Sequence, residues 1–251
     1  MDLTDPHAGD AAWRGLYATA AVGALLTAAL FPFQMLLYIG WPPPAHGTAA
    51  DWFAFFQANP LHGLLSLDLV MMAEQVLVIP IVLALYRLLH RSGESTMALA
   101  LAGWLAGATL FVASNTAFQM LSLSDGYAAA TSDAARASFL AAGEVMLATY
   151  WGQGTAFVFG YVLTAVAGVL VGAVMLRSRM FGRLAASGAI AGNLLSLALF
   201  LPGIGVGLSL LSVVILWVWY VLVGVRLARL AGRPSARTVP AEHAAFPVAA
   251  S

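Results

Sequence analysis

Long apolar runs separated by short polar segments make up most of this chain. A helix needs about 20 apolar residues to cross the roughly 30 Å hydrocarbon core of a bilayer. Runs of about this length recur along the chain, and most of them end at proline, glycine or arginine. The pattern predicts six transmembrane helices, at residues 16–40, 61–89, 97–121, 155–176, 184–201 and 206–227.

Two other segments are predicted to be helices that do not cross the membrane. The first, at 51–56, is aromatic and too short to span, and Thr48 or Asp51 can cap it. The second, at 133–151, is only moderately apolar and follows a polar stretch in which Asp125-Gly126 signals a turn. The expected fold is therefore all-α: a polytopic membrane helix bundle of six transmembrane helices plus two short external interfacial helices.

Composition supports a membrane protein. The 251 residues are 61% hydrophobic and 9% charged, with mean hydropathy +0.88, whereas soluble domains carry about 25% charged residues. Such a chain has too little charge to cover a surface that faces water. It contains no cysteine, which excludes disulfides, thiolate metal sites and a cysteine nucleophile. The zero net charge gives no reason to expect a nucleic-acid partner.

The arginines predict the orientation, because cytoplasmic loops are enriched in basic residues. With six spans and a cytoplasmic N-terminus, every arginine except Arg136 falls on the cytoplasmic side. The alternative is a seventh span at 133–151. It would place the arginines that follow the second run and those that follow the fourth run on opposite sides of the membrane. Arginine as the only basic residue, together with abundant alanine, is typical of a bacterial chain. We therefore predict a multi-pass protein of the bacterial plasma (inner) membrane with both termini in the cytoplasm.

The domain organisation follows from these runs. Residues 1–15 are expected to form a cytoplasmic N-terminal segment, 16–231 a single transmembrane bundle and 232–251 a disordered cytoplasmic tail rich in alanine and proline. Acidic residues stand where a signal peptide would have a basic region, so the first apolar run is expected to remain as a span.

Two arginine-containing segments carry a family resemblance. Ala84-Leu85-Tyr86-Arg87-Leu88-Leu89 closes the second span, and Met175-Leu176-Arg177-Ser178-Arg179-Met180-Phe181-Gly182-Arg183 follows the fourth. Both resemble the uncharacterised bacterial multi-pass family catalogued as domain of unknown function 4386. The resemblance covers most of the chain. It implies a helical bundle in a membrane and implies no activity.

Polar residues inside the spans are the candidates for function. Asp, Lys or Arg at the centre of a span costs about 2.5–3.5 kcal/mol on insertion scales, so acids there are functional candidates. The second span contains His62, Asp68, Glu74 and Gln75. At 100° per residue, Asp68 and Gln75 share one helix face, whereas Glu74 lies well around the helix.

Further polar residues lie at a similar depth: Asn115 and Gln119 in the third span and Glu144 on the external helix. We hypothesise an outward-facing pocket around Asp68, Glu74, Asn115 and Gln119. The candidate ligand-binding residues are His62, Asp68, Glu74, Gln75, Asn115, Gln119 and Glu144.

Each candidate also has a structural interpretation. Amides and hydroxyls join helices by hydrogen bonds, His62 fits the membrane interface, Glu144 fits a solvated helix face, and the two acids can be neutral structural groups. Metal-ligand spacings such as HxxxH and HExxH are missing, so no metal site and no cofactor are predicted.

Three functions remain open. The first is binding or transport of a small apolar or lipid-like molecule. The second is an integral-membrane enzyme acting on a lipid or isoprenoid, with Asp68 or Glu74 as general acid. The third is a structural or regulatory protein without turnover. The expected partners are membrane lipids and a small apolar ligand, and the oligomeric state is left open.

Overall fold

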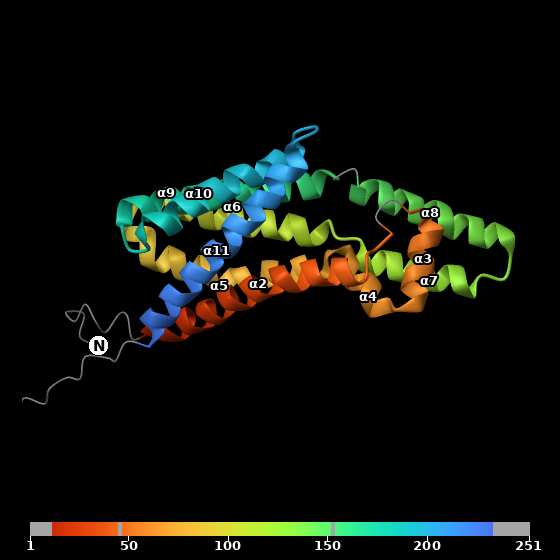
Figure 1. The fold of residues 1–251 in the computed structure, drawn as a ribbon, viewed down its shortest axis with the longest axis horizontal. Coiled ribbons are helices and arrows are strands. Elements are labelled where there is room, and N and C mark those ends of the chain that lie inside the picture. The colour runs from red at the N-terminus through yellow and green to blue at the C-terminus, as the bar shows by residue number, and fades with distance from the viewer. Residues whose placement is uncertain (1–11, 45–46, 152–153, 233–251) are drawn as a thin grey trace, which may run out of the picture.

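A computed structural model describes residues 12–44, 47–151 and 154–232, apart from the side chains of Asp68 and Trp151 (Figure 1). Residues 1–11 of the predicted N-terminal segment lie outside the described residues. The same holds for all but the first residue of the predicted tail at 232–251.

Six stretches of the described residues are long and apolar enough to cross a membrane, which confirms the predicted all-α bundle. They are Arg14–Gly40, Val70–Ser92, Glu94–Ala129, Asp133–Ser178, Gly182–Phe200 and Gly205–Ala231. The predicted external helix at 133–151 belongs to the fourth stretch, so the described residues contain no seventh one. The stretch of 36 residues at Glu94–Ala129 is about 54 Å long. It therefore extends well beyond the hydrocarbon core.

Six helices form a closed ring, which we call the bundle. Each packs against the next in the order α2, α5, α6, α9, α10, α11 and back to α2 (Figure 1). Their bounds are α2 Arg14–Gly40, α5 Val70–Leu89, α6 Glu94–Ala113, α9 Thr155–Ser178, α10 Gly182–Ser196 and α11 Gly205–Ala231. Short 3₁₀ segments, His90–Ser92 and Leu197–Phe200, follow α5 and α10.

Small residues let the bundle helices approach closely. A Cβ on Gly107 of α6 would lie 2.7 Å from the Gly160 carbonyl oxygen of α9, and a Cβ on Gly160 would lie 2.8 Å from the Gly107 carbonyl oxygen. The two backbones therefore touch at this crossing. Such contacts are typical of membrane helices, which gain stability from close packing because lipid supplies no hydrophobic drive between them.

Four helices form a second unit at one end of the bundle, which we call the cap (Figure 1). They are α3 Ala49–Ala58, α4 Pro60–Leu64, α7 Ala117–Ala129 and α8 Asp133–Trp151. The core of the cap is aromatic: Trp52, Phe53 and Phe56 are each at most 1% exposed. Both predicted external helices are therefore present, as parts of α3 and α8. The third long helix of the cap, α7, packs against both of them.

The predicted turn at Asp125-Gly126 is wrong, because both residues lie inside α7. The chain turns instead at 130–132, between α7 and α8. A Cβ on Gly126 would meet the Phe139 ring of α8 at 2.5 Å. This glycine therefore serves close packing between two helices, a role that sequence alone does not distinguish from a turn.

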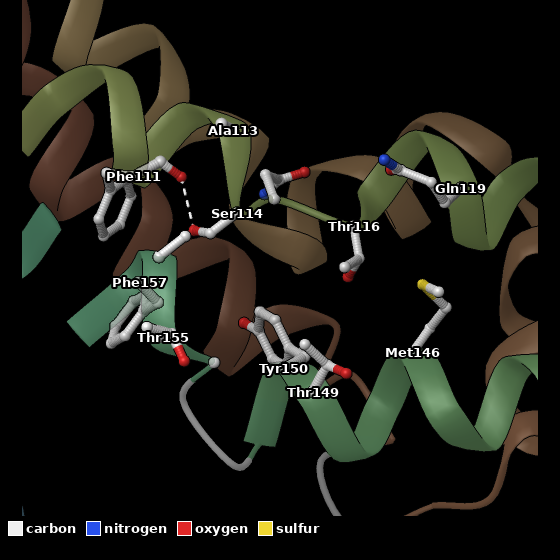
Figure 2. Close-up of a pocket in the computed structure, with 13 residues that line it drawn as sticks. Phe111, Ala113, Ser114, Thr116, Gln119, Met146, Thr149, Tyr150, Thr155 and Phe157 are labelled. Carbon is white, nitrogen blue, oxygen red and sulfur yellow. Dashed lines mark hydrogen bonds between the residues drawn. The ribbon is translucent and has the colours of Figure 1, made fainter. Parts of the chain in front are cut away.

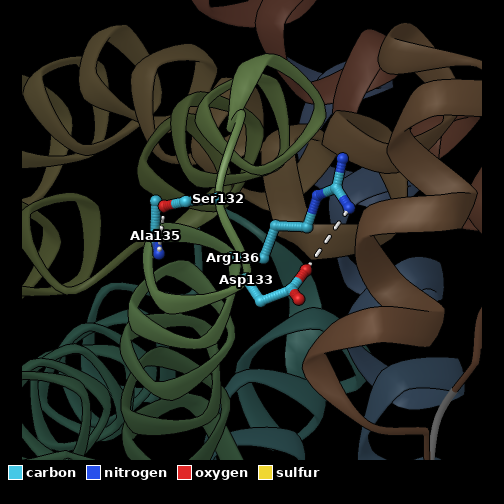
Figure 3. A network of polar contacts seen from close by, with 4 residues as sticks. All are labelled: Ser132, Asp133, Ala135 and Arg136. Atoms are coloured by element: carbon cyan, nitrogen blue, oxygen red, sulfur yellow. Dashed lines mark hydrogen bonds and ion pairs between the residues drawn. The ribbon is translucent and has the colours of Figure 1, made fainter.

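Arginines gather at the end of the bundle opposite the cap, which we call the arginine end. There lie Arg14, Arg87, Arg91, Arg177, Arg179, Arg183, Arg226 and Arg229. Among the described residues, only Arg136 belongs to the cap. Its guanidinium lies 3.9 Å from the Asp133 carboxylate at the start of α8, where the Ala135 N–H donates to the Ser132 hydroxyl (Figure 3). Exposed pairs of this kind contribute about 0–1 kcal/mol.

Candidate functional site

The third and fourth membrane-length stretches each consist of two helices, and the two junctions between these helices lie at the same level. α6 ends at Ala113 and α7 begins at Ala117, while α8 ends at Trp151 and α9 begins at Thr155. α6 has 20 residues and α9 has 24, which correspond to about 30 Å and 36 Å. The two junctions therefore lie about one hydrocarbon thickness from the arginine end. We call this level the seam.

A pocket of about 440 Å³ lies at the seam (Figure 2). Its volume is within the range of small-molecule sites. Among the residues that the structure describes, apolar and uncharged polar side chains share its lining, and none of them is acidic, basic or a histidine. The lining residues are Phe111, Ala113, Ser114, Asn115, Thr116, Gln119, Met146, Thr149, Tyr150, Gly154, Thr155, Ala156 and Phe157.

The pocket is aromatic toward the bundle and more polar toward the cap. The Phe111 and Phe157 rings, from α6 and α9, have centroids 5.3 Å apart. Gln119 and Met146 lie at the opposite side (Figure 2). A molecule in the pocket would meet an apolar surface at one end and hydrogen-bonding groups at the other.

Thr116 is the most notable polar group in this lining. Its side chain is only 8% exposed, and its hydroxyl oxygen has no hydrogen-bond partner in the described structure. Figure 2 shows the side chain directed into the pocket. Ser114 and Thr149 differ, because their hydroxyls donate to the carbonyls of Phe111 and Val145, at 2.7 and 2.9 Å.

Asn115 joins the seam to the second span. Its amide nitrogen donates to the Leu67 carbonyl at 2.8 Å, and its amide oxygen accepts from the Ala117 N–H at 2.9 Å. Leu67 lies in a π-helical segment, Leu65–Leu69, between α4 and α5. A π turn shifts hydrogen bonding from i+4 to i+5, so a carbonyl there can lose its α-helical donor. Asn115, in the junction between α6 and α7, supplies a donor for the Leu67 carbonyl.

Of the six predicted site residues whose side chains the structure describes, two line the pocket. Asn115 and Gln119 line it, whereas Glu74 and Gln75 do not. Glu74 is 7% exposed inside the bundle, and its carboxyl group interacts electrostatically with the Tyr220 side chain of α11. The Gln75 side-chain oxygen is buried without a partner. The Asp68 side chain lies outside the described part of the structure.

The other two predicted residues belong to the cap. The Glu144 carboxylate accepts a hydrogen bond from the Ala49 N–H at 2.7 Å, so it ties α8 to the first turn of α3. An acid at a helix N-terminus also interacts favourably with the helix dipole. His62 packs its ring against Phe55 and Trp41, with centroids 4.8 and 5.8 Å apart.

Sequence reasoning missed the pocket residues Phe111, Met146, Thr149 and Phe157. In a chain this apolar, an aromatic residue that lines a pocket has the same local pattern as one that faces lipid. Their shared property is position near the two junctions, and neither junction is marked by proline. The described residues contain no group of three or more His, Asp or Glu side chains that could hold a metal ion.

Comparison with family models, curated proteins and solved structures finds no match to this chain. The resemblance to domain of unknown function 4386 stays a prediction.

Proposed function

We propose that this protein lies in the bacterial plasma (inner) membrane and binds a small apolar or lipid-like molecule in the seam pocket. The observation that carries the proposal is a pocket of about 440 Å³ whose described lining residues are uncharged, about one hydrocarbon thickness from the arginine end. A molecule that dissolves in lipid can reach this depth without leaving the membrane.

Exposed aromatic side chains near the seam support entry from lipid. Phe118 of α7 is 58% exposed and Phe159 of α9 is 59% exposed. Each lies within two residues of a pocket-lining residue. Large exposed apolar side chains are unfavourable in water, so this surface fits contact with acyl chains.

The closed side of the pocket favours binding over passage through the bundle. The Phe111 and Phe157 rings lie at its bundle side, and α6 and α9 touch one turn further, at Gly107 and Gly160. Transport past this point would require these helices to separate. The enzyme alternative relied on Asp68 or Glu74 as general acid, and Glu74 does not line the pocket.

The arginines support the proposed orientation, with the arginine end in the cytoplasm and the cap outside. The chain has no cysteine, so single cysteines can report it. We expect Ser132→Cys to react with a membrane-impermeant maleimide in right-side-out vesicles. Ser178→Cys should react only after the membrane is opened. The reverse pattern would overturn the orientation.

Photo-crosslinking tests the binding function. The probe is dodecanol carrying a diazirine in its chain, added to the full-length protein in detergent micelles. We expect crosslinks in the peptides that contain Phe111, Gln119 and Met146. Ala156→Phe fills the pocket and should abolish them.

Val166→Phe is the matched control for this variant, because Val166 lies in the same helix and is 45% exposed outside the pocket. It should leave the crosslinks unchanged. Equal labelling of Ala156→Phe and the unmodified protein would contradict the proposal.

A further inference from the structure

The seam pocket offers hydrogen bonds without charge, and this restricts the ligand. We infer that the bound molecule is an uncharged amphiphile whose head group carries a hydroxyl or carbonyl oxygen, and that the Thr116 hydroxyl hydrogen-bonds to this oxygen. The inference rests on the proposed binding function and specifies its ligand class.

The lining explains why a charged head group is excluded. Carboxylate, phosphate and ammonium groups lose hydration on entering a pocket. Only an opposite charge or several hydrogen bonds compensate for the free energy of hydration that is lost. None of the described lining residues carries a charge. The described arginines lie at the arginine end, apart from Arg136, which pairs with Asp133 at the start of α8. A neutral head group avoids this desolvation cost.

The Thr116 hydroxyl has no hydrogen-bond partner because of two local features. A threonine in a helix usually donates to a carbonyl three or four residues earlier, as Thr149 does. Thr116 follows the end of α6, so no continuous helical turn precedes it. Threonine at an N-cap usually accepts from the helix instead. Thr116 occupies the N-cap of α7 without doing so.

Burial makes this open hydroxyl selective. Thr116 is 8% exposed and its hydroxyl is buried without a partner, so a ligand oxygen placed against it supplies a missing hydrogen bond. A hydroxyl both donates and accepts, which matches a ligand hydroxyl or carbonyl equally well. The apolar part of the ligand would then lie against Phe111 and Phe157 at the bundle side of the pocket.

A series of competitors with one chain and different head groups tests the assignment. Dodecanol, dodecane, dodecanoate and dodecylamine compete with the diazirine-bearing dodecanol for crosslinking to the full-length protein. The pH is chosen so that the last two are ionised, and the micelle composition is held constant. We expect dodecanol to compete at least about tenfold more strongly than either ion. Dodecanol should also compete more strongly than dodecane. Competition by dodecanoate or dodecylamine as strong as that of dodecanol would overturn the neutral ligand class.

Substitution of Thr116 tests its role directly. Thr116→Val keeps the shape and removes the hydroxyl, so we expect dodecanol binding to weaken about three- to tenfold. Thr116→Ser retains the hydroxyl and should restore most of the affinity. Thr109→Val is the control, because Thr109 is exposed on α6 and its hydroxyl donates to the Leu105 carbonyl.

The outcomes separate the two proposals. If the unmodified protein is not labelled, or if Ala156→Phe is labelled equally, the binding function itself fails. If Ala156→Phe blocks labelling while Thr116→Val binds dodecanol as tightly as Thr109→Val does, binding stands and the head-group assignment is overturned. Gel filtration of each variant verifies the fold. If Thr116→Val does not fold, Thr116→Ala replaces it and is compared with Thr116→Ser.

Discussion

The bundle and the cap are held together in opposite ways. The bundle packs helices through small residues, and at Gly107 and Gly160 the backbones themselves touch. The cap buries large aromatic side chains, led by Trp52, Phe53 and Phe56. Packing of small residues is effective where the surroundings are as apolar as the helices. Burial of large aromatic surface is effective where the alternative is water. The change in packing style therefore fits the proposed arrangement, in which the bundle lies in lipid and the cap extends toward water.

Few polar contacts connect these two regions. Asn115 links the start of α7 to the Leu67 carbonyl, while the Glu144 carboxylate acts within the cap, between α8 and α3. The pocket lies where the two packing styles meet, since neither backbone contact nor aromatic packing fills the space at the two junctions.

The largest effect is expected from emptying the aromatic core of the cap. Phe53→Ala removes a fully buried ring and should lower the free energy of unfolding of the cap by about 3–5 kcal/mol. Hydrogen exchange should rise in α3, α7 and α8 and stay slow in α9. Phe118→Ala, on a ring that is 58% exposed, should leave exchange unchanged. A uniform rise over bundle and cap would show that the two regions unfold as one.

Enlarging a glycine at the α6–α9 crossing should have the next largest effect on stability. Gly107→Ala places a methyl group 2.7 Å from the Gly160 carbonyl oxygen, so the helices must move apart. We expect a loss of about 1–3 kcal/mol in stability, measured by denaturant unfolding in detergent. Gly207→Ala, where nothing lies within 4 Å, should be neutral or slightly stabilising because alanine favours helix. Equal effects of both variants would refute backbone packing as the basis of the bundle.

The link between the regions should have a smaller effect. Asn115→Asp keeps the acceptor for the Ala117 N–H and removes the donor to the Leu67 carbonyl. We expect a loss of about 1–2 kcal/mol, because a buried carbonyl is left without its partner. Hydrogen exchange should increase in the first turn of α5 and at the start of α7. No change there would mean that Asn115 does not couple cap and bundle.

Acid should produce the smallest effect, at the start of α3. The Thr48 hydroxyl and then the Thr48 N–H donate hydrogen bonds to the Asp51 carboxylate, which holds its pKa below the ordinary value of 3.8. A lowered pKa in the folded state means that this stabilisation is present above pH 3.8. It is lost as the pH falls through the lower folded value. Exchange of the Ala49–Ala58 segment, corrected for its intrinsic pH dependence, should increase below pH 3.8. Asp51→Asn should remove this extra increase.

The spans were predictable because a long apolar run has few other interpretations. The junctions were not, since Ser114, Asn115 and Thr116 are all tolerated within a helix. The π-helical segment Leu65–Leu69 also has no sequence signal here. It changes the angular spacing on which the predicted shared face of Asp68 and Gln75 depended. The polar residues of the third span were recognised as candidates, but the role of Thr116 follows only from its burial and from the missing partner of its hydroxyl.

The composition of the cap core sets an order for biosynthesis. Trp52, Phe53 and Phe56 are made before α5, whereas Met120 of α7 and Leu147 of α8, which complete their core, are made after α6. In the proposed orientation, the early aromatic residues cross the membrane before the ribosome has made α7 and α8. Until then they remain uncovered, which makes this interval the stage at which a chaperone or a protease can act on the nascent chain. Completion of the cap would signal that α2, α5 and α6 have been inserted in the correct order.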